Sequence, residues 1–138
     1  MLNRVQLIGN LGADPEIRAT QNGDQVVNLS VATSERWKDK QTGEKREITE
    51  WHRVVCFNQN LCEVMADYLK KGSKVFIEGQ LRTRKWTDQA GTERYTTEVV
   101  MQHNATLTLL DSQRNGPPPA DNPDNYGTAA DYQAQSGR

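Results

Sequence analysis

The stretch EWHRVVCF, residues 50–57, decides how this chain is expected to fold. In a β-strand successive side chains point to opposite faces, so Trp51, Arg53, Val55 and Phe57 share one face. Val54 then lies on the other face, with the neighbouring cysteine, and can enter a core. The stretch is therefore predicted to be a strand with one buried face, while its other face carries two aromatic rings and a cation.

Further strand-like runs lie on both sides of this stretch. They are rich in β-branched and apolar residues, and polar segments that contain glycine separate most of them. The predicted strands cover residues 4–10, 26–33, 48–57, 74–86, 94–101 and 105–110. Turn signals at Asn22-Gly23, Gly43 and Gly91 predict that neighbouring strands are antiparallel.

One helix is predicted between the third and fourth runs. Asn60 suits its N-cap position, with Glu63 as the capping-box partner. Lys70 and Lys71 suit the negative end of the helix dipole, and Gly72 suits the position after the helix. Apolar residues recur between them at helical spacing: Leu61, Val64, Met65, Tyr68 and Leu69. This order predicts an all-β OB-fold, a five- to six-stranded Greek-key barrel with one helix between strands 3 and 4.

Composition divides the chain into two parts. Residues 1–110 are expected to form one domain, and residues 111–138 are expected to be a disordered tail because they are rich in Asp, Asn, Gln, Gly and Pro. The tail holds two of the 17 Lys+Arg and four of the 18 Asp+Glu, so the domain carries a net charge of only +1. A near-neutral domain binds nucleic acid only through local charge placement and non-ionic contacts.

Nothing in the sequence predicts export or a membrane span. No signal peptide precedes the first strand, and no apolar run approaches the length that a membrane requires. A cytoplasmic location with two free thiols is therefore expected.

All three tryptophans lie among basic residues. They are Trp37 with Arg36 and Lys38, Trp51 with Arg53, and Trp86 with Arg82 and Arg84. The alternative, that these rings are only core residues, would have to hold for each of the three tryptophans independently. Aromatic rings stack on any nucleobase at about 1–3 kcal/mol each, and Arg and Lys neutralise phosphates. A duplex hides the faces of its bases, so such a surface favours single strands.

The sequence resembles the bacterial single-stranded DNA-binding proteins of the homotetrameric OB-fold type. The resemblance covers residues 1 to about 110, in the runs NRVQLIGNLGADPEIR, VATSERW, TEWHRVV and YLKKGSKVFIEGQLRTRKWTDQAGTERYTTEVV. It implies sequence-nonspecific binding and protection of single-stranded DNA in replication, recombination and repair, on the nucleoid. It also implies a homotetramer, paired partly through the N-terminal strand, with His52 at a subunit interface.

The resemblance further implies roles for individual side chains. The residues expected to stack on bases are Trp37, Trp51, Phe57 and Trp86. The nearby cations chosen as phosphate contacts are Arg53, Arg84, Lys85, Arg36 and Arg82. Strict alternation places Lys85 on the face opposite Trp86, so its assignment requires a strand end that presents both faces to the DNA.

Three alternatives bear on this interpretation. The family usually ends in an acidic tip that recruits replication and repair proteins, but this sequence ends AQSGR, so such recruitment stays open. A module that binds RNA or protein, and a small hydrolytic enzyme, are the other candidate functions. No metal or cofactor is expected and an enzyme is not favoured, because His52, His103, Cys56 and Cys62 match no common zinc pattern and no phosphate-binding loop is present.

Overall fold

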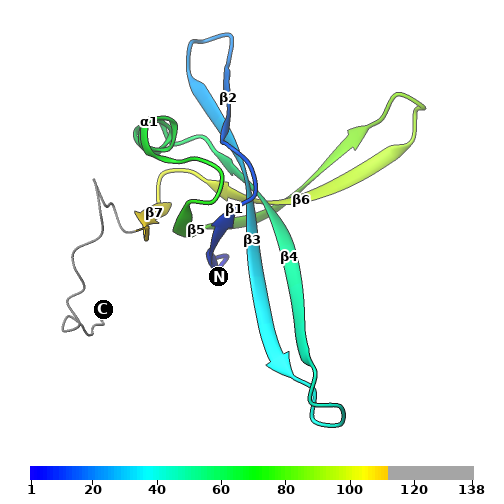
Figure 1. Cartoon of the computed structure of the whole chain (residues 1–138). Helices are drawn as coiled ribbons and strands as arrows, with labels where there is room; N and C mark the ends of the chain where they lie inside the picture. The colour runs from blue at the N-terminus through cyan, green and yellow to red at the C-terminus, as the bar shows by residue number, and fades with distance from the viewer. Residues whose placement is uncertain (112–138) are drawn as a thin grey trace, which may run out of the picture.

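The computed structural model describes residues 1–111, which form seven strands and one helix (Figure 1). The elements in chain order are β1 (Val5–Leu11), β2 (Glu16–Ala19), β3 (Gln25–Lys38), β4 (Lys45–Cys56), α1 (Gln59–Tyr68), β5 (Lys74–Thr87), β6 (Glu93–Met101) and β7 (Thr106–Leu109). The tail predicted from its composition lies, from residue 112 onward, outside the described residues.

Five of the strands close into a barrel. The strands pair in the order β1-β3-β4-β6-β5, and β5 pairs with β1 again, which closes the ring. β4 and β6 are parallel, and the other pairs are antiparallel. β2 pairs with β3 and β7 pairs with β5, both outside the ring. The predicted all-β barrel, with its helix between the third and fourth barrel strands, is confirmed.

The core lies inside this ring and beneath α1. On β4, Val54 and Cys56 are fully buried, as the alternation of that strand predicts. Val55, predicted on the outward face with Trp51, is buried as well, since this end of β4 pairs with β6 and places Val55 opposite the buried Val100. Cys62 and Met65 of α1 close the core from one side. The other buried core residues come from four strands, β1, β3, β5 and β6: Leu11, Val27, Leu29, Val31, Val75, Ile77, Val99 and Met101, with Leu69 following the helix.

The helix was predicted correctly, but both predicted caps were wrong. Asn58 is the N-cap instead of Asn60, and its side-chain oxygen accepts a hydrogen bond from the backbone N–H of Leu61 at 3.2 Å. The helix ends at Tyr68, so no basic residue lies in its last turn. Gly72, with φ of 91°, lies in the turn that leads into β5. The capping-box pattern favoured Asn60, but the side chain of Asn58 also donates to the backbone oxygen of Gln102 at 3.1 Å, a contact that only the tertiary structure provides.

β2 is a strand that the sequence did not predict. All four of its residues are exposed, so it lacks the apolar alternation that marks a half-buried strand. It forms because the turn at Gly23, with φ of 87°, folds Glu16–Ala19 back along β3. The turn itself was predicted correctly from Asn22-Gly23.

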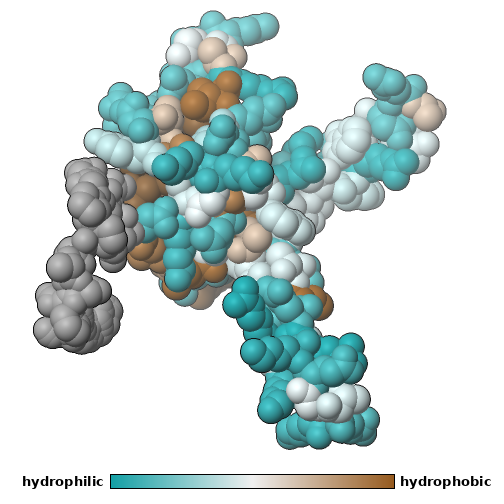
Figure 2. All heavy atoms as spheres, viewed as in Figure 1, coloured by the Kyte–Doolittle hydropathy of each residue, from teal (hydrophilic) through white to brown (hydrophobic). Residues whose placement is uncertain are grey.

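Two hairpin arms project from the barrel (Figure 1). The β3–β4 pairing continues to Lys38 opposite Lys45, and the β5–β6 pairing continues to Thr87 opposite Glu93. Outer residues of both arms are exposed, and the arms are mostly hydrophilic (Figure 2). Since a lone two-stranded ribbon has no core, cross-strand side-chain pairs stabilise it, such as the hydroxyl pair of Ser34 with Thr49 at 2.9 Å.

Candidate nucleic-acid interface

Trp51 and Arg53 lie side by side along one exposed face of β4. Trp51 is 61% exposed although it belongs to a barrel strand. Its partner across β3 is Ala32, and the partner of Arg53 is Ser30. Because these partners are small, they leave the indole ring and the guanidinium uncovered.

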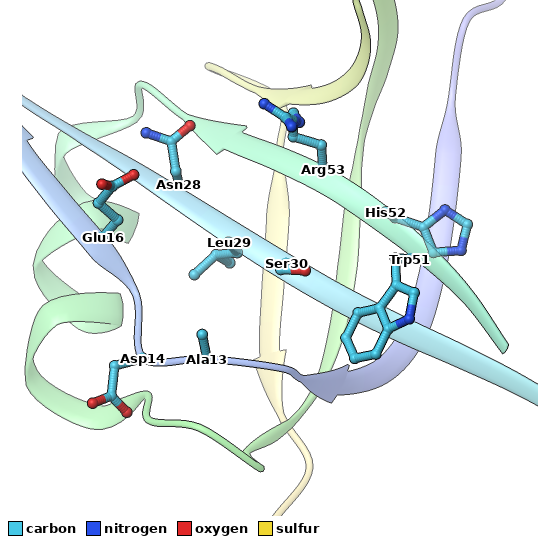
Figure 3. Close-up of a pocket in the computed structure, with 9 residues that line it drawn as sticks. All are labelled: Ala13, Asp14, Glu16, Asn28, Leu29, Ser30, Trp51, His52 and Arg53. Carbon is cyan, nitrogen blue, oxygen red and sulfur yellow. The ribbon is translucent and has the colours of Figure 1, made fainter.

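A groove of about 530 Å³ runs beside this face (Figure 3). Its lining residues are Ala13, Asp14, Glu16, Asn28, Leu29, Ser30, Trp51, His52 and Arg53. Two carboxylates in it already have partners: Asp14 accepts the backbone N–H of Lys71 at 2.8 Å, and Glu16 pairs with Arg18 at 3.0 Å. The groove therefore offers an aromatic surface and a cation, together with two carboxylates that are each hydrogen-bonded to another part of the protein.

Trp37 lies near the end of the β3–β4 arm and is 50% exposed. Its cross-strand partner is Arg46, whereas the partner of Trp51 is Ala32. Ala32 lies on the same face as its partner Trp51, and Trp37 is five positions further along β3. An odd spacing places Trp37 on the other side of the strand, so the two indoles lie on opposite local faces of the ribbon. Two-stranded ribbons twist strongly, and the twist turns these faces along the arm.

Basic side chains surround Trp37 at the arm tip. A hollow there is lined by Arg36, Trp37, Lys38, Lys45, Arg46 and Glu47. Arg36 is paired with Glu47 at 3.0 Å. Lys38 lies directly opposite Lys45, and two like charges in this relation repel each other unless an anion lies between them. The sequence interpretation missed Lys45 and Arg46, since only the cross-strand register brings them to the tryptophan.

The β5–β6 arm carries the third tryptophan. Trp86 is 41% exposed, and its indole N–H donates to the hydroxyl of Thr96 at 2.7 Å. Arg84 donates to the buried carboxylate of Glu98 at 3.1 Å. Lys85 pairs with Glu93 at 2.8 Å. The ring is thus held by its nitrogen, while the two cations beside it already have carboxylate partners.

The five cations chosen from the sequence therefore differ in availability. Arg36, Arg84 and Lys85 each form a salt bridge with a carboxylate. Arg53 and Arg82 form none within residues 1–111. The two arginines without a bridge can meet a phosphate without first leaving a protein partner.

His52 lies within β4, and Phe57 follows the last residue of that strand. Phe57 is 44% exposed, and its backbone N–H donates to Met101 at 2.9 Å. It borders a polar hollow shared with residues 58–60 and 102–103. His52 faces away from Trp51, is half-buried, and its Nε2 is hydrogen-bonded to the hydroxyl of Thr33 at 2.8 Å.

Three titratable groups in the described part of the chain have shifted pKa values. Burial raises the pKa of the Cys56 thiol to about 12 and also raises the pKa of Cys62. Among residues 1–111 no three His, Cys, Asp or Glu side chains cluster as metal ligands would. Hydrogen bonds, first from Arg94, lower the pKa of Asp88 in the β5–β6 turn. In the same residues no helix is long and apolar enough to cross a membrane.

Comparisons with known proteins agree with this geometry. The family model described as "Single-strand binding protein family" matches residues 2–107. A curated protein of Rhizobium meliloti (strain 1021), named "Single-stranded DNA-binding protein", is 61% identical over 113 residues, which are 81% of this chain and 65% of that protein. The chain thus matches just under two thirds of that relative's length.

A solved structure is also similar over most of the described fold. It is named "Plasmodium falciparum SSB complex with ssDNA", is 38% identical and superposes with a TM-score of 0.72. The match covers 80% of this chain and 96% of that one.

Proposed function

The chain belongs to the single-strand binding protein family, and we propose that it binds and protects single-stranded DNA without sequence specificity in replication, recombination and repair. One observation carries the proposal. Each of the three tryptophans is 41–61% exposed, and each has a basic residue beside it on the same strand. This arrangement is costly for a folded protein in water, and it suits a ligand with alternating aromatic and anionic groups.

Stacking supplies most of the proposed affinity. Trp37, Trp51, Phe57 and Trp86 present rings on which bases stack, worth about 1–3 kcal/mol each. Base stacking is insensitive to sequence because every base has an aromatic face. This explains how a domain with almost no net charge can bind a polyanion.

Phosphate contacts supply the salt-dependent part. Arg53 and Arg82 are the first candidates, because neither forms a salt bridge within the described residues. Arg36, Arg84 and Lys85 can contact a phosphate only if they leave their carboxylate partner or bind the carboxylate and the phosphate at the same time. Counterion release then makes the affinity fall with salt, with a slope that reports how many of these cations take part.

The proposal includes a homotetramer in the cytoplasm, bound to the DNA of the nucleoid. We place the N-terminal strand and His52 at subunit contacts. Replacement of His52 by Ala is expected to loosen assembly more than it lowers the stability of one subunit. Sedimentation at low micromolar concentration tests this, with the exposed His103→Ala as the matched control, and an unchanged tetramer would argue against the role of His52.

A fluorescence titration tests the binding function. Single-stranded dT oligomers are expected to quench the tryptophan fluorescence strongly, while duplex competes poorly. The titration should be run at several salt concentrations on protein of known mass, together with an RNA oligomer of the same length. Equal affinity for duplex would refute the proposal, and preference for RNA would favour the RNA-binding alternative.

The proposal is for a binding protein without catalytic activity. The buried cysteines, with pKa values raised by burial, are poor nucleophiles at neutral pH. Incubation of DNA with the purified protein, with and without divalent metal, is expected to return the strand uncut.

A further inference from the structure

Gly12 lies directly against the indole of Trp51. A Cβ atom built on Gly12 would lie 2.3 Å from Cζ3 of that ring, 2.9 Å from Cη2 and 3.4 Å from Cε3. All three atoms belong to the six-membered ring. Since Cζ3 is nearest and its two neighbours are farther away, the outer corner of the ring, and not the middle of its face, meets the glycine.

The ring reaches Gly12 across the sheet. Figure 3 shows the indole projecting from β4 over the β3 ribbon toward the end of β1. Gly12 follows β1 immediately, and its backbone N–H donates to the carbonyl of Ser30 on β3 at 2.9 Å. The glycine is therefore fixed to the barrel, and the ring edge rests on a rigid surface.

Residue 12 must lack a side chain, but it does not need a backbone conformation that favours glycine. The glycines with positive φ in the described chain are Gly23, Gly43, Gly72 and Gly91. Gly12 is not among them, so alanine can adopt its backbone conformation without strain. The three heavy atoms nearest to a methyl group at residue 12 would all belong to the ring of Trp51.

A glycine within β1 shows the contrast. A Cβ atom on Gly9 would lie 2.2 Å from the backbone oxygen of Ala32, which is part of the barrel wall. Gly9 thus serves the close approach of two strands. Gly12 instead makes room for a side chain that is 61% exposed and has little part in the core.

We propose that Gly12 is a positioning residue for single-stranded DNA. It lets the edge of the Trp51 ring dock against the backbone, which holds the indole in one orientation and leaves its face open to a base. This inference rests on the proposed function. It adds Gly12 to the residues that support DNA binding, although Gly12 contacts the ring of Trp51 and not the DNA. A ring held in advance loses less conformational freedom on binding than a mobile one.

The test is a double-mutant cycle with Gly12→Ala and Trp51→Phe. A phenyl ring can still stack on a base, but it is smaller than an indole and does not extend to residue 12. In the wild-type background Gly12→Ala is expected to weaken binding of a short dT oligomer about tenfold, within the range of one lost stack. In the Trp51→Phe background the same change is expected to alter the affinity less than twofold.

Urea unfolding of the same four proteins separates positioning from folding. Gly12→Ala is expected to keep the unfolding midpoint close to that of wild type, because an exposed ring can rotate away. Gly9→Ala is the matched control and is expected to lower the midpoint clearly.

Three results would overturn the inference. They are unchanged binding by Gly12→Ala, an equal loss in both backgrounds, and a Gly12→Ala protein that is unfolded and is not rescued by Trp51→Phe. A wild-type protein that fails to bind the oligomer would refute the proposed function itself, which is a different outcome.

Discussion

Replacement of Trp51 by Ala separates the two roles that an aromatic residue on a barrel strand can have. If the ring is a DNA-stacking group, its loss weakens binding and leaves the fold in place. If it is a core residue, its loss unfolds the barrel. The exposure of Trp51, 61%, makes the two outcomes different in size.

The binding loss follows from one stacking contact. Removal of about 1–3 kcal/mol raises Kd by roughly 5- to 150-fold. The effect is measured best with a short labelled dT oligomer that occupies one OB domain, about 4–16 nucleotides. Fluorescence anisotropy of the label is the suitable signal, because the substitution removes one of the intrinsic tryptophan reporters.

The stability loss follows from the covered part of the ring. About two fifths of Trp51 is covered, which for a side chain of roughly 250 Å² is about 100 Å². At about 25 cal/mol per Å² this is at most about 2.5 kcal/mol, less than the usual stability of about 5–15 kcal/mol for a domain. Urea unfolding should therefore show a folded Trp51→Ala protein with a lower midpoint.

Tyr68→Ala is the matched control, since Tyr68 is 60% exposed on α1 and is not among the proposed DNA contacts. It is expected to leave the oligomer affinity unchanged. The stacking role of Trp51 is refuted if Trp51→Ala binds the oligomer within twofold of wild type, or if Tyr68→Ala weakens binding equally. It is also refuted if Trp51→Ala is unfolded without urea.

Other predictions concern charges and thiols. Arg84→Ala should lower the free energy of unfolding by about 1–3 kcal/mol, because it leaves the Glu98 carboxylate, 8% exposed, without its partner. Arg82→Ala should keep the stability of wild type and weaken oligomer binding. Equal urea midpoints for the two variants would contradict this difference. Cys56, whose pKa is raised to about 12, should react with a thiol reagent at pH 8 only as urea unfolds the protein; fast native labelling would contradict its burial. The folded-state pKa of Asp88 is lowered, so its contribution is present above about pH 4 and is lost as pH falls through the folded pKa. Asp88→Asn should therefore lower the thermal midpoint at pH 7 and approach wild type at pH 3, and a pH-independent difference would refute the linkage.

Local patterns predicted much of the fold. The alternation in residues 50–57 correctly separated the buried Val54 and Cys56 from the exposed Trp51, but it wrongly placed the buried Val55 on the exposed face. Glycine turns at residues 23, 43 and 91 were recognised because a positive φ leaves a strong compositional trace. The helix was found from its apolar spacing, but its cap was placed two residues late, at Asn60 instead of Asn58.

Features without a local trace were missed. β2 has four exposed residues, so no periodicity marks it. The salt bridges of Arg36 and Arg84 depend on which carboxylate the strand register places beside them. From sequence, every arginine beside a tryptophan looks equally free to meet a phosphate.

The sequence by itself determined that Val54 and Cys56 of β4 face inward, where the chain turns, and the resemblance to single-stranded DNA-binding proteins. These properties depend on neighbours a few residues apart, and short-range sterics and periodicity act over that distance. Only the tertiary structure decided how the barrel closes through β5 and β1, which cations are already paired, and that Gly12 supports the ring of Trp51. Those contacts join segments far apart in the chain, and they exist only after the strand register has formed.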